Sequence, residues 1–217
     1  SAMLRFLTAG ESHGPSLVVI VDGLPAGLPV DPAALTRDLR RRQRGHGRGR
    51  RMAIEADAAV ITGGVRRGLT TGAPVALRID NRDWVNWAFT MHPDAKPPAD
   101  AGGAHRPPIT RPRPGHADLA GALKYGHADL RDVLERASAR ETAARVAAGA
   151  LARLLLAEVG IDVASHVTAI GPERSGGAVV AFDDILALDD ESPTRCADEA
   201  ASARMVAAID RAREAGD

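Results

Sequence analysis

Two histidines, each beside a glycine, are the residues best placed for acid–base chemistry. His13 lies between Gly10 and Gly14, directly before an apolar run over residues 17–21. Glycine permits positive φ and lets a ligand approach the backbone closely, so this turn could hold an imidazole at a cleft. A histidine that only caps a hairpin loop would have the same surroundings, and the pentapeptide alone leaves both interpretations open.

His116 follows a proline-rich approach, residues 111–114, and precedes a predicted helix. A rigid proline-rich segment of this kind would hold the imidazole in a fixed position. The helix dipole disfavours the cationic form of a histidine at a helix N-terminus, whereas a carboxylate such as Asp118 favours it. A capping or loop role is again the alternative.

Arginine is the third chemical feature, since only Lys96 and Lys124 among the 28 basic residues are lysines. Seven arginines fall within residues 40–51, interleaved with glycines. A guanidinium binds phosphate or carboxylate with two parallel hydrogen bonds, so Arg41, Arg42 and Arg48 could converge on one anion. A solvated basic surface or a nucleic-acid patch would show the same spacing.

Residues 135–142 combine a helix start with flanking arginines. Ser138 followed by Glu141 is a capping-box pattern, which is a sufficient structural explanation for both residues. Exposed N–H groups at a helix start beside Arg136 and Arg140 would also bind a phosphate. The pattern does not separate these two functions.

Composition limits the function classes. The 217 residues are 45% hydrophobic with a formal net charge of zero, which argues against a dedicated nucleic-acid or membrane binder. The single cysteine, Cys196, excludes an intrachain disulfide and points to a reducing cytoplasm, and no apolar run reaches the roughly 20 residues of a transmembrane helix. Residues 1–2 are interpreted as a tag scar.

Hydrophobic periodicity predicts a mixture of helices and strands. Helices are expected over residues 31–42, 138–159 and 197–215, with helical character from 117 onward. In the second of them Val146, Ala150, Leu154 and Leu155 should form the buried face. Strands are expected over 17–21, 52–61 (as one or two strands), 74–79 and 163–170, and residues 4–8 form a short alternating segment before the first of them. A long Pro/Gly-rich loop over 81–114, a turn over 70–72 and an acidic loop over 183–193 complete an α+β pattern.

Four of these segments occur together in one order: Gly10 to Pro25, the Arg-Gly segment ending at Met52, Arg113 to Asp118, and Arg136 to Ala143. In order and spacing they resemble the chorismate synthase family over essentially the whole chain. The resemblance implies a layered α+β sandwich with antiparallel sheets and helices between them, of which residues 1–217 are the N-terminal portion of a single domain.

The resemblance also implies an activity. It is that of a shikimate-pathway lyase that converts 5-enolpyruvylshikimate 3-phosphate into chorismate and phosphate by anti-1,4-elimination. Reduced FMN is the implied cofactor, without net redox change, and NADPH is a possible source of its reduction. A cytoplasmic homotetramer is implied for the full-length protein, with no metal, nucleic-acid or membrane partner.

Site residues follow from the matched motifs. His13 would assist departure of the phosphate, and His116 would protonate or hydrogen-bond the reduced flavin. The resemblance assigns Arg42, Arg48, Arg113 and Arg140 to the substrate or NADP, and Arg136, Ala137 and Ser138 to the flavin.

Members of the family extend well beyond residue 217, into a region with further flavin-binding residues and a proposed catalytic aspartate. We therefore expect this chain to be inactive, or only weakly active, by itself. The alternatives are a non-catalytic assembly half of a split enzyme and an Arg-rich nucleic-acid-binding module.

Overall fold

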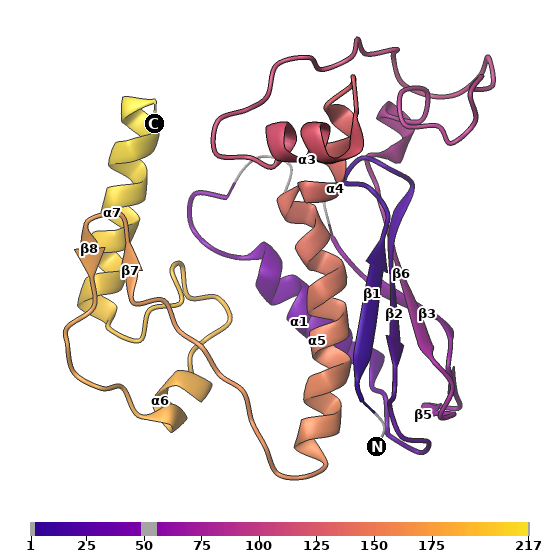
Figure 1. The fold of residues 1–217 in the computed structure, drawn as a ribbon. Helices are drawn as coiled ribbons and strands as arrows, with labels where there is room; N and C mark the ends of the chain where they lie inside the picture. Colours follow the sequence, from indigo (N-terminus) through magenta and orange to yellow (C-terminus); the bar gives the residue numbers. More distant parts are fainter. Residues whose placement is uncertain (1–2, 49–55, 217) are drawn as a thin grey trace. The chain divides into compact units, whose positions relative to one another are not determined.

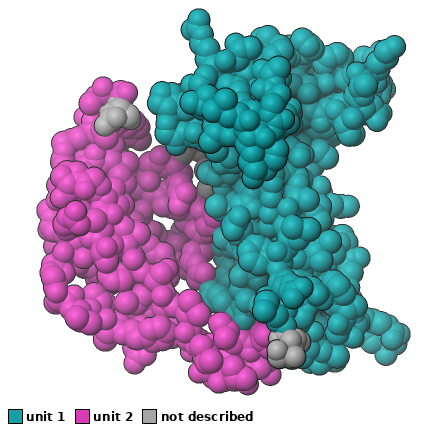
Figure 2. Space-filling model, viewed as in Figure 1, with its two compact units in different colours: residues 1–39, 57–154 teal, residues 40–56, 155–217 magenta. Residues whose placement is uncertain are grey.

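The computed structural model describes residues 3–48 and 56–216. Contacts divide the chain into two compact units (Figure 2): unit 1 comprises residues 1–39 and 57–154, and unit 2 comprises residues 40–56 and 155–217. Two of the three boundaries fall inside helices α1 (Pro32–Gln43) and α5 (Thr142–Ala157), and the third lies between residues 56 and 57. Assignment of the whole chain to a single domain stays a prediction.

Unit 1 contains a four-stranded antiparallel sheet in the order β1-β2-β6-β3 (Figure 1). The strands are β1 (Arg5–Ala9), β2 (Ser16–Asp22), β3 (Ala59–Gly63) and β6 (Val75–Asp80). The strands predicted over 17–21 and 74–79 are confirmed, and most of the alternating segment over 4–8 belongs to β1. Of the strand predicted over 52–61, only the part from Ala59 is a strand, and residues 52–55 lie outside the described residues.

The core of unit 1 lies on one face of this sheet. Alternate residues of β2 and β6 point to that face and are buried: Leu17, Val19, Val21, Val75, Leu77 and Ile79. Helices α1 and α5 supply the other side, and Arg153 of α5 donates to Asp38 of α1 at 2.8 Å. The α+β architecture predicted from the sequence is confirmed.

Small side chains form the buried face of α5, namely Ala143, Ala144, Ala147, Ala148 and Ala150 with Leu151. The predicted face is therefore wrong in part, because Val146, Leu154 and Leu155 are only half-buried. The prediction gave most weight to the large apolar residues, whereas alanines allow the helix backbone closer to its neighbours and so form the packed side.

Helix α5 begins at Thr142, later than the predicted Ser138, because a 3₁₀ turn, η2 (Ala139–Glu141), comes first. The Ser138 side chain accepts from the backbone N–H of Arg140, so Ser138 is an N-cap as expected. Glu141 instead accepts a hydrogen bond from Thr8 at 2.7 Å, so only half of the predicted capping box is present. Gly160, with φ +70°, follows the helix as predicted.

Residues 81–114 form the predicted long loop, interrupted by a 3₁₀ turn, η1 (Trp84–Asn86). Two short helices follow, α3 (Asp118–Tyr125) and α4 (Arg131–Ala137). A small hairpin of β4 (Val65–Arg66) and β5 (Leu69–Thr70) was not predicted; it turns through Arg67 and Gly68, both with positive φ. The predicted turn over 70–72 therefore begins inside a strand.

Besides the end of α1, the described residues of unit 2 form a short hairpin, β7 (Ala169–Ile170) with β8 (Glu173–Arg174), and the helices α6 (Phe182–Leu186) and α7 (Glu199–Ala215). Cys196, Ala201 and Met205 form its buried cluster. Helix α7 was predicted correctly. The strand predicted over 163–170 is wrong except for its last two residues, because backbone groups such as the Val167 N–H bond to loop carbonyls rather than to a ladder.

The prediction of an acidic loop over 183–193 is wrong at its start, because the first residues of that range belong to helix α6. Across residues 3–48 and 56–216, no helix is both long and apolar enough to cross a membrane.

Candidate active site

The turn between β1 and β2 requires glycine. Gly10 has φ +98°, and a Cβ there would overlap the carbonyl oxygen of Ser16. The Asn81 side chain donates to the carbonyl of Gly14 at 2.8 Å, and the Asn81 N–H donates to the carbonyl of Pro15 at 2.9 Å. The sheet and the start of the long loop therefore fix the backbone that carries His13.

Glu135 of α4 holds the imidazole of His13. Both carboxylate oxygens lie 2.8 Å from His13 Nδ1, and one of them also accepts the His13 backbone N–H at 2.8 Å. The Ser12 N–H donates to the Glu135 carbonyl at 3.0 Å. The Glu135 side chain is fully buried, whereas 17% of the His13 side chain is exposed. The imidazole therefore lies partly at the surface, and the carboxylate that it contacts lies inside the protein.

Trp87 packs against the face of His13. The two rings are stacked with centroids 3.7 Å apart and planes 28° from parallel. The Trp87 indole N–H donates to Asp83 at 2.8 Å, which anchors the indole, and the Arg106 guanidinium lies 3.9 Å from its ring centroid. Trp87, at the start of the long loop, therefore packs on a candidate catalytic residue.

The C-terminal end of α4 is bound to the same turn. Arg136 donates to the carbonyls of Gly10 and Thr8 at 3.0 and 2.9 Å, and Ser138 Oγ donates to Ser12 Oγ at 3.1 Å. Ala137, between them, is exposed. The structure therefore brings Arg136 and Ser138 together with His13, although more than 120 residues separate them in the sequence.

His116 belongs to a second cluster, which has its own buried carboxylate. Its Nδ1 lies 2.5 Å from Asp118, whose side chain is fully buried. Arg113 donates to the same carboxylate at 3.0 Å and also lies 3.0 Å from His116 Nδ1. The pKa of Asp118 is lowered to about 2, chiefly by the hydrogen bond from the Arg113 side chain, against the raising effect of burial. Asp118 is therefore an anion at neutral pH.

Arg140 is a buried residue of the core edge. Its Nη1 lies 3.0 Å from Asp57, and the two side chains are only 4% and 2% exposed. It also donates to the Asp80 carbonyl at 3.4 Å, at the end of β6. To bind a substrate anion, as the sequence predicts, Arg140 would have to share its charge with Asp57.

Arg42 and Arg48 belong to unit 2. Arg42 lies in the last turn of α1, and exposed Arg48 donates from Nε to the Arg44 carbonyl at 3.0 Å. Their neighbours face acids of the same unit, since Arg41 lies 3.9 Å from Asp190 and Arg44 pairs with Glu191. A cavity of about 250 Å³ is lined by Arg41, Arg44 and Arg48 among others. Arg50, Arg51 and Met52 lie outside the described residues.

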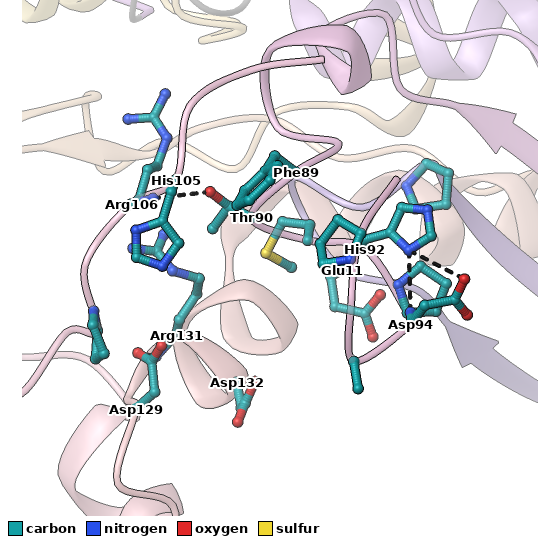
Figure 3. A pocket seen from close by; sticks show the side chains of 16 residues that line it. Glu11, Phe89, Thr90, His92, Asp94, His105, Arg106, Asp129, Arg131 and Asp132 are labelled. Carbon is teal, nitrogen blue, oxygen red and sulfur yellow. Dashed lines mark hydrogen bonds and ion pairs between the residues drawn. The ribbon is translucent and has the colours of Figure 1, made fainter. Parts of the chain in front are cut away.

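Unit 1 has a larger cavity, of about 680 Å³, which the long loop and the start of α4 enclose. In Figure 3, His92 and Asp94 lie on one side of it, and His105, Arg106 and Arg131 on the other. Arg131 is 8% exposed. Among the described residues, neither Arg106 nor Arg131 forms an ion pair, so these cations could receive an anion.

Comparison with known proteins then decides the family. The chorismate synthase family model matches residues 4–217. The chain belongs to the chorismate synthase family.

Relatives agree with this assignment. Chorismate synthases of Symbiobacterium thermophilum and Desulforudis audaxviator are 60% and 59% identical to the chain over 215 residues. A crystal structure of chorismate synthase superposes with a TM-score of 0.74 at 37% identity, covering the whole chain. The chain spans about half the length of these proteins, with 55% of the first relative and 55% of the solved chain covered.

Within this chorismate synthase fold, sequence reasoning missed two residues of the His13 cluster. Glu135 was part of a noted motif but received no function, since an ionised glutamate is rarely expected to be fully buried. Trp87 was not predicted to have a function. Both reach His13 through contacts over long sequence separations, which local spacing does not encode. Arg106 and Arg131 were missed for the same reason.

Proposed function

We propose that the chain is the N-terminal portion of a chorismate synthase, a lyase of the shikimate pathway. The reaction converts 5-enolpyruvylshikimate 3-phosphate into chorismate and phosphate by an anti-1,4-elimination that uses reduced FMN without net redox change. The family match over residues 4–217 carries this proposal. The names of the relatives, about half of whose length the chain spans, support it.

His13 is the proposed proton donor for the departing phosphate. Expulsion of phosphate from carbon is favoured by a proton donor and by groups that stabilise the developing charge. An imidazole held on a buried carboxylate, with part of its surface exposed, suits this task. Loss of one such contact in a water-poor site costs about 3 kcal/mol of barrier.

Arg136, Ala137 and Ser138 are the proposed flavin contacts, with His116 as the second acid–base group. The segment fits a planar ring, because Ala137 is exposed and presents no bulky side chain between α4 and η2. When bound, reduced FMN would supply electron density transiently as the phosphate leaves. In its cationic form His116 would carry a transferable proton at Nε2, while its Nδ1–H donates to Asp118.

The substrate carries a phosphate and carboxylates, which several arginines would neutralise. Arg42, Arg48, Arg113 and Arg140 are the proposed ligands, with Arg42 and Arg48 also candidates for NADPH as a source of flavin reduction. Arg113 is nearly half-exposed beside Asp118, so its outer edge remains accessible to an anion. Arg140 is the most deeply buried member of the set.

The chain alone is proposed to be inactive or weakly active, and the full-length protein to be a cytoplasmic homotetramer. The share of the relatives that it covers supports the first point, because other residues of the family site would lie in the remaining part. It also favours a second candidate function, a non-catalytic assembly half. The pairing of Arg41 and Arg44 with acidic residues weighs against a nucleic-acid surface in unit 2.

A chimera tests the proposal. Residues 3–217 would replace the matching half of the Symbiobacterium thermophilum relative, and chorismate release would be assayed with reduced FMN. We expect turnover by the chimera, little by the chain alone, and loss of turnover on His13→Ala. Normal turnover by the His13→Ala chimera would refute the role of His13, and a folded but inactive parent chimera would refute the proposed function.

The assembly alternative needs a separate arm. The chain would be mixed with the separately expressed C-terminal half of the same relative. Chorismate release from the mixture would support complementation of two halves, whereas a folded, associated but inactive mixture would contradict it.

A further inference from the structure

Glu135 makes an unusual set of contacts for a glutamate in a short helix. Its carboxylate is fully buried, accepts the backbone N–H of His13, and lies 2.8 Å from His13 Nδ1 through both oxygens. A single residue therefore binds both the backbone and the ring of His13. Burial of an ionised carboxylate is unfavourable unless donors surround it, so these contacts also explain why Glu135 is tolerated inside unit 1.

The carboxylate determines which ring nitrogen of His13 carries the proton. An ionised carboxylate only accepts hydrogen bonds, so the nitrogen that faces it must bear hydrogen. In the neutral imidazole this is Nδ1–H, which leaves the basic lone pair on Nε2, at the opposite edge of the ring. In the cationic form both nitrogens carry hydrogen, and Nδ1–H still donates to Glu135.

Trp87 fixes the remaining freedom of the ring. Its indole is stacked on the imidazole at 3.7 Å and is itself anchored by Asp83 at 2.8 Å. With one edge bound to Glu135 and one face covered by Trp87, the His13 ring has one orientation, with its Nε2 edge turned away from the carboxylate.

We infer that Glu135 is a positioning residue, which holds His13 as the Nδ1–H tautomer and directs Nε2 toward the reacting group. Within the proposed function, on which this catalytic role rests, His13 Nε2–H donates a proton to the departing phosphate. Glu135 then keeps the resulting neutral imidazole in the tautomer that can be protonated again at Nε2. Glu135 itself does not touch substrate, because its buried carboxylate contacts His13 in this arrangement.

Glu135→Gln separates this function from a merely structural one. The amide matches the carboxylate in shape, but it has only one oxygen. That oxygen is required by the backbone N–H of His13, so the NH₂ group turns toward Nδ1 and donates to it. The variant should therefore keep its fold and invert the tautomer of His13 to Nε2–H. Glu158→Gln, at an exposed position near the end of α5, is the matched control.

The first readout is nitrogen-15 NMR of the histidine rings in the chain itself, with His13→Gln identifying the His13 signals among seven histidines. We expect Nδ1–H in the parent and in Glu158→Gln, and Nε2–H in Glu135→Gln. An Nε2–H tautomer in the parent, or the same tautomer in a folded Glu135→Gln, would overturn the inference. The parent spectrum keeps this test valid even if the variant does not fold.

The second readout is turnover of the chimera. Glu135→Gln should lower kcat by about 10²- to 10⁴-fold, the usual share of general acid–base catalysis, with KM nearly unchanged and an altered pH profile. An unchanged kcat with an inverted tautomer would overturn the catalytic part of the inference. An inactive parent chimera would instead count against the proposed function, while the NMR result still decides the tautomer.

Discussion

The buried ion pair between Asp57 and Arg140 should make a large contribution to the stability of unit 1. Asp57→Ala leaves the Arg140 guanidinium inside the protein without its carboxylate, which normally costs about 3–5 kcal/mol. The geometry supports that range. At a separation of 3.0 Å, with both side chains at most 4% exposed, two unit charges attract by about 5 kcal/mol at an effective dielectric constant of about 20.

Two further variants test the physical reason for this loss. The double variant Asp57→Ala, Arg140→Met removes both charges, so it should be more stable than Asp57→Ala by at least about 1 kcal/mol. Asp80→Ala breaks the ion pair with Arg78, whose side chains are 49% and 58% exposed, and should cost less than about 1 kcal/mol.

Urea unfolding followed by tryptophan fluorescence measures these stability losses in unit 1. Both tryptophans of the protein, Trp84 and Trp87, lie in unit 1. With a slope of about 2 kcal/mol per molar urea, a loss of about 4 kcal/mol lowers the midpoint by about 2 M. If Asp57→Ala loses no more stability than Asp80→Ala, the pair is not the buried interaction described above. Arg140 would then be more available to a substrate than its position indicates.

Two other experiments follow from the geometry. Gly121 of α3 faces Val133 of α4, where an added Cβ would overlap the valine methyl groups, so Gly121→Ala should destabilise unit 1 by about 1–3 kcal/mol in the same urea titration. Gly149, on the exposed side of α5 with open space around it, is the matched position, and Gly149→Ala should stabilise by about 0.5–1 kcal/mol; the reverse order would contradict both assignments. Because the pKa of Asp118 is lowered from 3.8 to about 2, its stabilising effect is complete above about pH 4 and is lost as pH falls through about 2. Over that window the unfolding free energy of Asp118→Asn should depend less on pH than that of the parent, and equal slopes would show that Arg113 and His116 do not stabilise the anion.

Local patterns in the sequence were sufficient for most of the elements of unit 1. Alternation over 17–21 and 74–79 predicted β2 and β6 because each strand has one buried face, and the Asp31-Pro32 start predicted α1. The same reasoning failed over 163–170, where β-branched residues suggested a strand. A strand needs a partner with free backbone groups, and within residues 163–170 only Ala169–Ile170 finds one, in β8.

The candidate site likewise combines local features that the sequence predicts with long-range contacts that it does not predict. The Gly10–Gly14 turn and the Ser138 cap are local features, and both were predictable from residue type and spacing. Their contacts depend on the path by which α4 and the long loop come back to the β1–β2 turn. Glu135, for example, is 122 residues from His13 in the sequence. Periodicity carries no information on that return, so the buried carboxylate and the stacked indole became apparent only in the structure.

The two histidines nevertheless share one arrangement, reached by different routes. Each imidazole is bound at Nδ1 by a fully buried carboxylate, Glu135 for His13 and Asp118 for His116. Asp118 is only two residues from His116, so its influence could be anticipated, whereas Glu135 is supplied by another element. At His13 the carboxylate places the lone pair of the neutral ring on Nε2, whereas His116 Nδ1 also lies 3.0 Å from the Arg113 guanidinium, which can only donate. The proposed acid–base function of His13 therefore rests on a tautomer that Glu135 selects, whereas the tautomer of His116 depends on how Asp118 and Arg113 share its Nδ1.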